Sequence, residues 1–167
     1  MIQKKICILG AAGVGKTSLT AQFVYSKFSE KYLSTMGVKI DRKQVEVGNT
    51  SVNLMIWDIH GEEKYKKITT SYLRGASGII TVIDGTRPDT VPTALEILER
   101  VEQDLGIIPN VFLINKADLT DAWCIPNDTI EELAQHHQST PVYKTSAKTG
   151  EHVEESFLKL AEMLIQS

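Results

Sequence analysis

Short apolar runs alternate with segments of helical periodicity along almost the whole chain. Continuous apolar runs of four to eight residues are typical of buried strands, and apolar positions repeated every three or four residues indicate amphipathic helices. Such runs predict strands at residues 4–9, 79–84 and 110–115, and a shorter strand at residues 141–145. Residues 38–47 and 51–58 are strand-like runs on either side of a hairpin signal. The periodic segments predict helices at residues 17–28, 90–105 and 127–137, and a last helix with the apolar stripe Val153, Phe157, Leu160, Ala161 and Leu164.

This order of elements predicts an α/β fold. Strands that alternate with helices form mostly parallel sheets, and residues 48–50, which read G-N-T, are typical of a hairpin that adds an antiparallel neighbour. We therefore expect a mostly parallel six-stranded sheet with one antiparallel edge strand and helices on both faces. The length of 167 residues fits a single domain over residues 1–167.

Residues 10–17 read G-A-A-G-V-G-K-T and match the pattern G-x-x-x-x-G-K-[ST] between a strand and a helix. Glycines allow successive backbone N–H groups to converge on phosphates. A lysine at this position reaches the outer phosphates, and the hydroxyl after it coordinates Mg²⁺. The motif predicts a P-loop NTPase fold, with a phosphate site made by Gly13, Val14, Gly15, Lys16, Thr17 and Ser18. By itself it separates neither ATP from GTP nor a kinase from a switch.

Two further loops, 115–118 (N-K-A-D) and 145–148 (T-S-A-K), each follow a predicted strand. The Asp118 carboxylate can accept hydrogen bonds from N1 and N2 of guanine, whereas adenine has no donor at N1. A site built to bond such a group rejects analogues without it on the order of 10⁴-fold. The backbone N–H of Ala147 can donate to guanine O6. Alone, N-K-x-D could be a polar loop, but its combination with the phosphate loop indicates guanine binding.

With these motifs the chain resembles the Ras superfamily of small GTPases, and within it the Rab-like branch, from residue 4 to the last helix. The resemblance implies that Asn115 ties the loops together and that Lys116 packs along the base. It also implies that Phe28 stacks on the other face of the base, although Phe28 could equally be a core aromatic residue that closes the first helix. Further nucleotide contacts are implied for Ser146 and Lys148.

The same resemblance predicts two switch segments. Asp58 and Gly61 match the family's D-x-x-G, in which the aspartate holds Mg²⁺, usually through water, and the glycine N–H contacts the γ-phosphate. Thr35 would meet Mg²⁺ with its hydroxyl and the γ-phosphate with its N–H; without the other motifs it would read as an ordinary loop residue. Because these contacts need a γ-phosphate, hydrolysis of GTP to GDP would release both segments.

Partner binding is implied for the same region. Effectors, exchange factors and GTPase-activating proteins would bind residues 30–40 and 58–74. Trp57 and Tyr72 match aromatic positions through which Rab-like proteins meet effectors, but core packing explains them equally well. Ile40 stands in place of the third aromatic residue of that group and departs from the Rab-like pattern.

Residues 58–62 read D-I-H-G-E where the family usually has D-T-A-G-Q. The residues expected to act in hydrolysis are Lys16, Gly61 and Glu62. Glutamine orients the attacking water, whereas Glu62 cannot donate a hydrogen bond to the phosphate and its charge repels it. His60 could crowd the γ-phosphate or donate a hydrogen bond to it, but we favour the interpretation that His60 is a solvated residue of this segment. We expect slow GTP hydrolysis, and the alternative is a binding module that stays loaded with GTP.

Composition narrows the remaining choices. Asn115 and Asp118 disfavour a metabolic P-loop kinase or ATPase, and the net charge of −3 gives no attraction to nucleic acid. The two cysteines, Cys7 and Cys124, form no metal or disulfide pattern and fit a reducing cytoplasm. Residues 163–167 contain no cysteine, so we expect no membrane anchor in the chain as given. We also expect the protein to be a monomer. The histidines near helix ends, His136, His137 and His152, are expected to be solvated.

Overall fold

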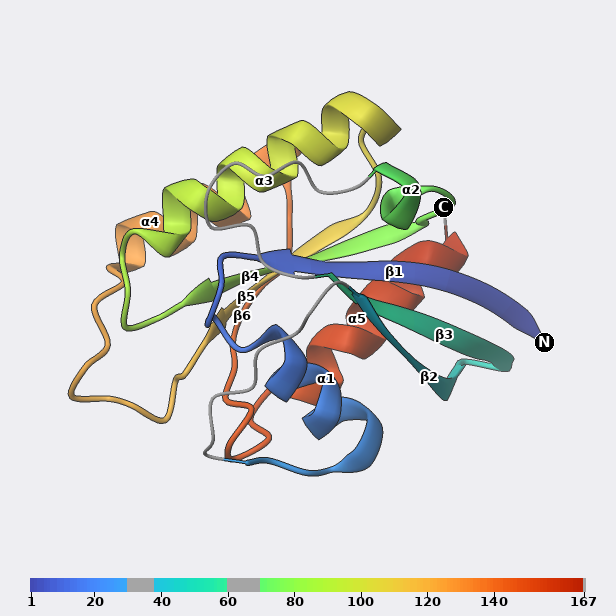
Figure 1. Ribbon diagram of the computed structural model, residues 1–167, viewed down its shortest axis with the longest axis horizontal. Helices are drawn as coiled ribbons and strands as arrows, with labels where there is room; N and C mark the ends of the chain where they lie inside the picture. The colour runs from blue at the N-terminus through green and yellow to red at the C-terminus, as the bar shows by residue number, and fades with distance from the viewer. Residues whose placement is uncertain (30–37, 60–69, 167) are drawn as a thin grey trace.

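The computed structural model describes residues 1–29, 38–59 and 70–166 and places a twisted sheet between two groups of helices (Figure 1). The described strands form one six-stranded sheet in the order β2-β3-β1-β4-β5-β6. Their bounds are Ile2–Gly10 (β1), Val38–Val47 (β2), Thr50–Ile59 (β3), Gly78–Asp84 (β4), Asn110–Asn115 (β5) and Val142–Lys144 (β6). The β2–β3 pair at the edge is antiparallel and the other four pairs are parallel, which confirms the predicted fold class.

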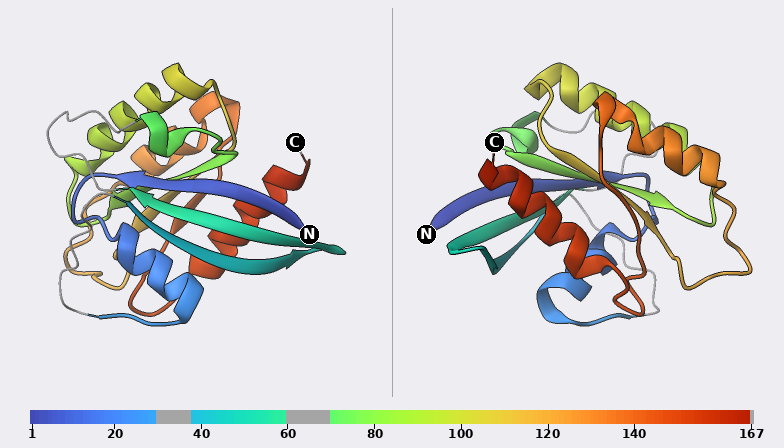
Figure 2. Two further views of the ribbon diagram at one scale, coloured as in Figure 1. Left: turned by 45° about the vertical axis from the view of Figure 1, so that its right-hand side comes forward. Right: turned by 180° about the vertical axis from the view of Figure 1, so that it is seen from behind.

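Helices cover both faces of this sheet. The helices are Lys16–Tyr25 (α1), Thr70–Leu73 (α2), Thr90–Leu105 (α3), Asn127–Ala134 (α4) and Val153–Gln166 (α5), with a short 3₁₀ helix at His136–Gln138 (η1). Figures 1 and 2 show α1 and α5 on one face and α3 and α4 on the other. Among the described residues, no helix is both long and apolar enough to cross a membrane.

Alternating side chains of β1 join the two cores. Ile6 and Ile8 pack in the cluster that contains α1 and α5, whereas Cys7 and Leu9 pack in the cluster that contains α3. This follows because successive side chains of a strand point to opposite faces. Since both faces are covered there, residues 6–9 of β1 form a continuous apolar run, and the carboxyl end of the strand carries the loop that leads into α1.

Burial of Cys7 leads to a testable difference between the two thiols. Burial raises the pKa of the Cys7 thiol to about 12, only partly offset by the nearby Lys5 ammonium. Cys124 is exposed. Because the thiolate is the reactive form, we expect the native protein to react with a disulfide reagent at Cys124 and not at Cys7. Counting released chromophore should give one thiol before and two after denaturation, and a second native thiol would contradict the burial of Cys7.

The structure corrects two predicted helix ends. The first helix ends at Tyr25 and not at residue 28, because Ser26 adopts a left-handed conformation (φ 53°) and its N–H donates to the Gln22 carbonyl at 3.0 Å. The helix predicted to reach residue 137 ends at Ala134, and His137 is again left-handed, with φ 48°. The short helix α2 was not predicted. These ends depend on local backbone turns that apolar periodicity does not record.

Candidate functional site

The predicted loops meet at one edge of the sheet, where the carboxyl ends of the parallel strands lie. Strand register places Asp58 of β3 beside Ile8 of β1, and Asp84 of β4 beside Asn115 of β5. Strands β1, β4 and β5 each continue into a loop at this edge, as expected for a ligand site of a parallel α/β sheet. This edge therefore collects polar groups from segments far apart in the sequence.

The loop between β1 and α1 requires glycine at two positions. Gly15 has φ 106°, and a Cβ added there would collide with the side-chain amide of Asn115. A Cβ on Gly10 would lie 2.5 Å from the Val82 carbonyl oxygen. The buried Lys16 ammonium donates to the carbonyls of Gly10 and Ala11 at 3.1 and 3.0 Å. The backbone thus wraps closely around a buried positive charge, an arrangement suited to phosphate.

Two of the predicted magnesium ligands are in direct contact. The Thr17 hydroxyl donates to Oδ2 of Asp58 at 2.5 Å, and Asp58 is fully buried. The two residues come from the start of α1 and the end of β3. A hydroxyl and a carboxylate oxygen placed together are the hard ligands that Mg²⁺ prefers, so the donor set fits this ion.

Asn115 connects the phosphate loop to the loop after β6. Its amide Nδ2 donates to the Val14 carbonyl at 3.0 Å, while Oδ1 accepts from the Thr145 hydroxyl and the Ala147 N–H, both at 3.3 Å. From α1, Gln22 supports the same loop by donating to the Ala147 carbonyl at 2.7 Å. No local pattern in the sequence indicates this role for Gln22, because its partner lies 125 residues away.

The two predicted base loops also meet each other. The Ser146 hydroxyl donates to Oδ1 of Asp118 at 2.8 Å and accepts a hydrogen bond from the Thr149 N–H at 3.0 Å. Ser146 is fully buried and Asp118 is half-buried. The carboxylate is therefore oriented by a fixed donor, which suits recognition of a paired donor on a ligand. Lys148, on the same loop, is exposed.

Lys116 reaches from the base loop to the phosphate loop. Its ammonium pairs with Oδ2 of the buried Asp84 at 2.8 Å and donates to the Gly13 carbonyl at 3.0 Å. Arg87 holds the same loop by donating to the Ala12 carbonyl at 2.9 Å. Sequence reasoning missed Asp84 and Arg87. A charged residue at the carboxyl end of an apolar strand could have indicated Asp84, whereas no local signal indicates Arg87.

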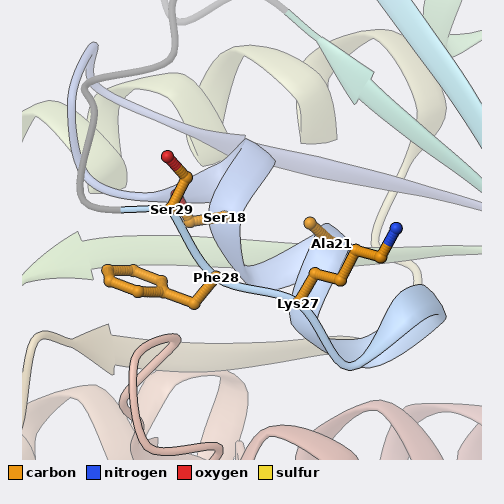
Figure 3. A pocket seen from close by; sticks show the side chains of 5 residues that line it. All are labelled: Ser18, Ala21, Lys27, Phe28 and Ser29. Atoms are coloured by element: carbon orange, nitrogen blue, oxygen red, sulfur yellow. The ribbon is translucent and has the colours of Figure 1, made fainter.

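Phe28 follows α1 and is not part of the core, since 39% of it is exposed. This contradicts the interpretation of Phe28 as a core aromatic residue. It lines a surface pocket of about 420 Å³ with Ser18, Ala21, Lys27 and Ser29. Figure 3 shows the Phe28 ring and the Lys27 side chain pointing in opposite directions from this segment. An exposed ring next to the phosphate loop can stack on a flat ligand, and that role stays a prediction.

Trp57 and Tyr72 are half-buried against the core cluster beneath α3, with ring centroids 6.5 Å apart. The Lys5 ammonium lies 3.6 Å from the centroid of the Trp57 ring. Across the β2–β3 pair, Ile40 faces Trp57 and is 44% exposed. The two aromatic residues therefore pack on the core and keep part of their surface accessible, and their role in binding effectors stays a prediction.

Thr35, His60, Gly61 and Glu62 lie outside the described residues, so their predicted roles rest on the sequence. The predicted site residues that are described gather at one edge of the sheet.

A protein-family model described as Ras family matches residues 5–166, almost the full length of the chain. Proteins of this family are GTP-binding switches with GTPase activity. The chain therefore belongs to the Ras family.

Proposed function

We propose that this chain is a switch of one G domain that binds GTP and GDP at the carboxyl edge of its sheet. The observation that carries this proposal is the set of bonds around Asn115, which joins the phosphate loop at Val14 to the base loop at Ala147. One ligand that has both phosphates and a purine would contact both loops. The proposed nucleotide contacts are the predicted residues of the two loops. Phe28, whose ring is partly exposed, would stack on the base.

Magnesium would be held by Thr17 and Asp58, together with Thr35. When bound, Mg²⁺ neutralises charge that develops on the phosphate oxygens. Asp58 Oδ2 already accepts a hydrogen bond from the Thr17 hydroxyl, so both oxygens are directed to one place. The adjacent Lys16 ammonium adds a positive charge on the phosphate side.

In this proposal the γ-phosphate controls the two switch segments. Thr35 and Gly61 would contact it through backbone N–H groups, and hydrolysis would remove those contacts. Effectors, exchange factors and GTPase-activating proteins would read residues 30–40 and 58–74. The partly exposed Trp57 and Tyr72 support a Rab-like partner surface, whereas the aliphatic Ile40 opposes it.

Identification of the nucleotide tests this function directly. We expect protein purified in Mg²⁺ without chelator to release GDP or GTP on denaturation, detected by ion-exchange chromatography. Unlabelled GTP should then displace a fluorescent GDP analogue at concentrations about 10⁴-fold below those needed for ATP. Co-purified adenine nucleotide, or equal displacement by ATP and GTP, would contradict the proposal.

The unusual Glu62 supports slow hydrolysis. At about 4 Å and an effective dielectric near 20, its carboxylate would repel a phosphate charge by up to roughly 4 kcal/mol. Help as a general base could offset about 10²-fold of the lost rate, but phosphoryl transfer depends mainly on positioning and charge stabilisation. We propose unassisted turnover on the order of 10⁻³ to 10⁻⁴ per second.

Replacing Glu62 with glutamine should therefore raise the rate of hydrolysis. The measurement is single-turnover conversion of pre-loaded GTP, followed by chromatography. Glu63→Gln is the matched control, because it removes the same charge from the neighbouring residue and should leave the rate unchanged. A slower Glu62→Gln protein would show that base help dominates. If neither the unmutated protein nor Glu62→Gln hydrolysed GTP detectably, the second candidate function would be favoured, a binding module that remains loaded with GTP.

A further inference from the structure

Glu102, His136 and His137 form a cluster away from the loops described above. Glu102 lies near the end of α3, and the two histidines belong to η1, which follows α4. Nε2 of His137 is 2.8 Å from Oε2 of Glu102, and Nε2 of His136 is 3.9 Å from Oε1. Figure 2 shows α3 and α4 side by side on one face of the sheet. Since η1 precedes β6 and α3 ends before β5, the cluster lies toward the amino ends of the strands, opposite the nucleotide loops.

The backbone brings the two neighbouring imidazoles together. His137 has φ 48° and ψ 39°, a left-handed conformation that is uncommon for residues other than glycine. Its ring centroid lies 4.1 Å from that of His136. The His136 ring packs edge-on against Phe112 of the core at 5.6 Å. We expected both histidines to be solvated; His137 is exposed, whereas His136 is half-buried.

His136 offers a buried nitrogen in need of a partner. Among the residues that the structure describes, its Nε2 has no hydrogen-bond partner, and the distance of 3.9 Å to Glu102 is too long for a hydrogen bond. Burial, and then the neighbouring His137, lower the pKa of His136, although Glu102 opposes this. A neutral imidazole is the form that binds metal ions. A buried polar atom without a partner is costly, and a metal ion would satisfy it.

We propose that Glu102, His136 and His137 bind a divalent transition-metal ion of the Zn²⁺ type. Their candidate ligand atoms all lie within 4.8 Å of one another. Tetrahedral zinc with ligands at about 2.0–2.2 Å spaces those ligands roughly 3.4 Å apart. The 2.8 and 3.9 Å separations lie on either side of this value but end on different oxygens of the Glu102 carboxylate, so rotation of the Glu102 side chain is needed to present one oxygen to the ion.

The donor set selects the class of ion. Two imidazoles and one carboxylate suit Zn²⁺, Ni²⁺ or Cu²⁺, whereas Mg²⁺ prefers oxygen ligands alone. Three protein ligands leave a fourth position for water. The ion would cross-link the end of α3 and the segment before β6, away from the phosphate loop, and would stabilise the packing of these elements.

Zinc titration in excess Mg²⁺ tests this proposal, because Mg²⁺ keeps oxygen-ligand sites saturated. Competition with a chromophoric zinc chelator should show one equivalent bound by the full chain. Glu102→Gln and His137→Gln should each weaken zinc affinity at least about tenfold. His152→Gln is the matched control. His152 also lies near a carboxylate, 4.0 Å from that of Glu151, but it belongs to no three-ligand cluster among the described residues.

Both variants, Glu102→Gln and His137→Gln, leave His136 unchanged because its ring contacts the core. A separate measurement checks that they fold. Thermal unfolding without zinc should be similar in all four proteins, and zinc should raise the melting temperature of the unmutated and His152→Gln proteins alone. Absence of stoichiometric binding in excess Mg²⁺ would overturn the proposal. Equal zinc affinity in Glu102→Gln and His137→Gln, or loss of binding only in Cys124→Ser, would overturn it as well.

Discussion

Replacing Asp118 with asparagine should change the base preference of the protein from guanine to xanthine nucleotides. The Ser146 hydroxyl donates to Oδ1 of Asp118, and the amide oxygen of asparagine can keep that bond. Its NH₂ group would then replace Oδ2, so a donor stands where guanine offers donors and where xanthine offers its C2 oxygen. Loss of the matching acceptor should weaken GTP binding by several kcal/mol, on the order of 10⁴-fold, and xanthosine triphosphate should gain.

The measurement is displacement of a fluorescent guanine nucleotide by GTP, xanthosine triphosphate and ATP. Asp121→Asn is the matched control, because Asp121 is an exposed carboxylate three residues along the same loop. It should leave all three affinities unchanged. An Asp118→Asn protein that keeps its affinity for GTP would show that the guanine edge is read by another group.

The central strands were predictable because they are buried on both faces. Such strands are continuous apolar runs that differ from the segments beside them, and the predicted bounds 110–115 agree with β5. Most residues of the edge strand β2 are exposed or half-buried, and its predicted bounds 38–47, which the structure reproduces, rested on the hairpin pattern at residues 48–50. Helix ends were predicted less well. The left-handed Ser26 ends α1, and the left-handed His137 lies inside η1, beyond the end of α4 at Ala134. Such conformations depend on the surrounding turn and not on the apolar period.

The candidate site was also predictable only in part. The loops that carry motifs follow strands, as predicted, and meet because parallel strands direct their carboxyl ends to one edge of the sheet. Contacts made by single side chains outside these motifs could not be predicted from the sequence. Gln22 supports Ala147, and Arg87 supports Ala12, across 125 and 75 residues. The Glu102 and His137 pair is separated by 35 residues and carries no spacing pattern either.

Replacing Lys16 with alanine should remove most of the affinity for nucleotides that have outer phosphates. Lys16 is 6% exposed, so its ammonium acts in a region largely closed to water. Removing one partner of such a charged pair costs about 2–5 kcal/mol, which corresponds to roughly 30- to 5,000-fold in dissociation constant. Because the predicted contact is with the outer phosphates, GTP and GDP should lose far more affinity than GMP.

Titration calorimetry with GTP, GDP and GMP measures these differences. Lys159→Ala removes the same charge from α5, where the lysine pairs with Glu162 at 3.6 Å, and should change none of the three affinities. The Lys16 ammonium also bonds the carbonyls of Gly10 and Ala11, so the variant could lose affinity through a distorted loop alone. A distorted loop would weaken GMP together with GTP, whereas loss of the phosphate contact leaves GMP nearly unchanged. Equal losses for all three nucleotides would therefore contradict the assignment of Lys16 to the outer phosphates.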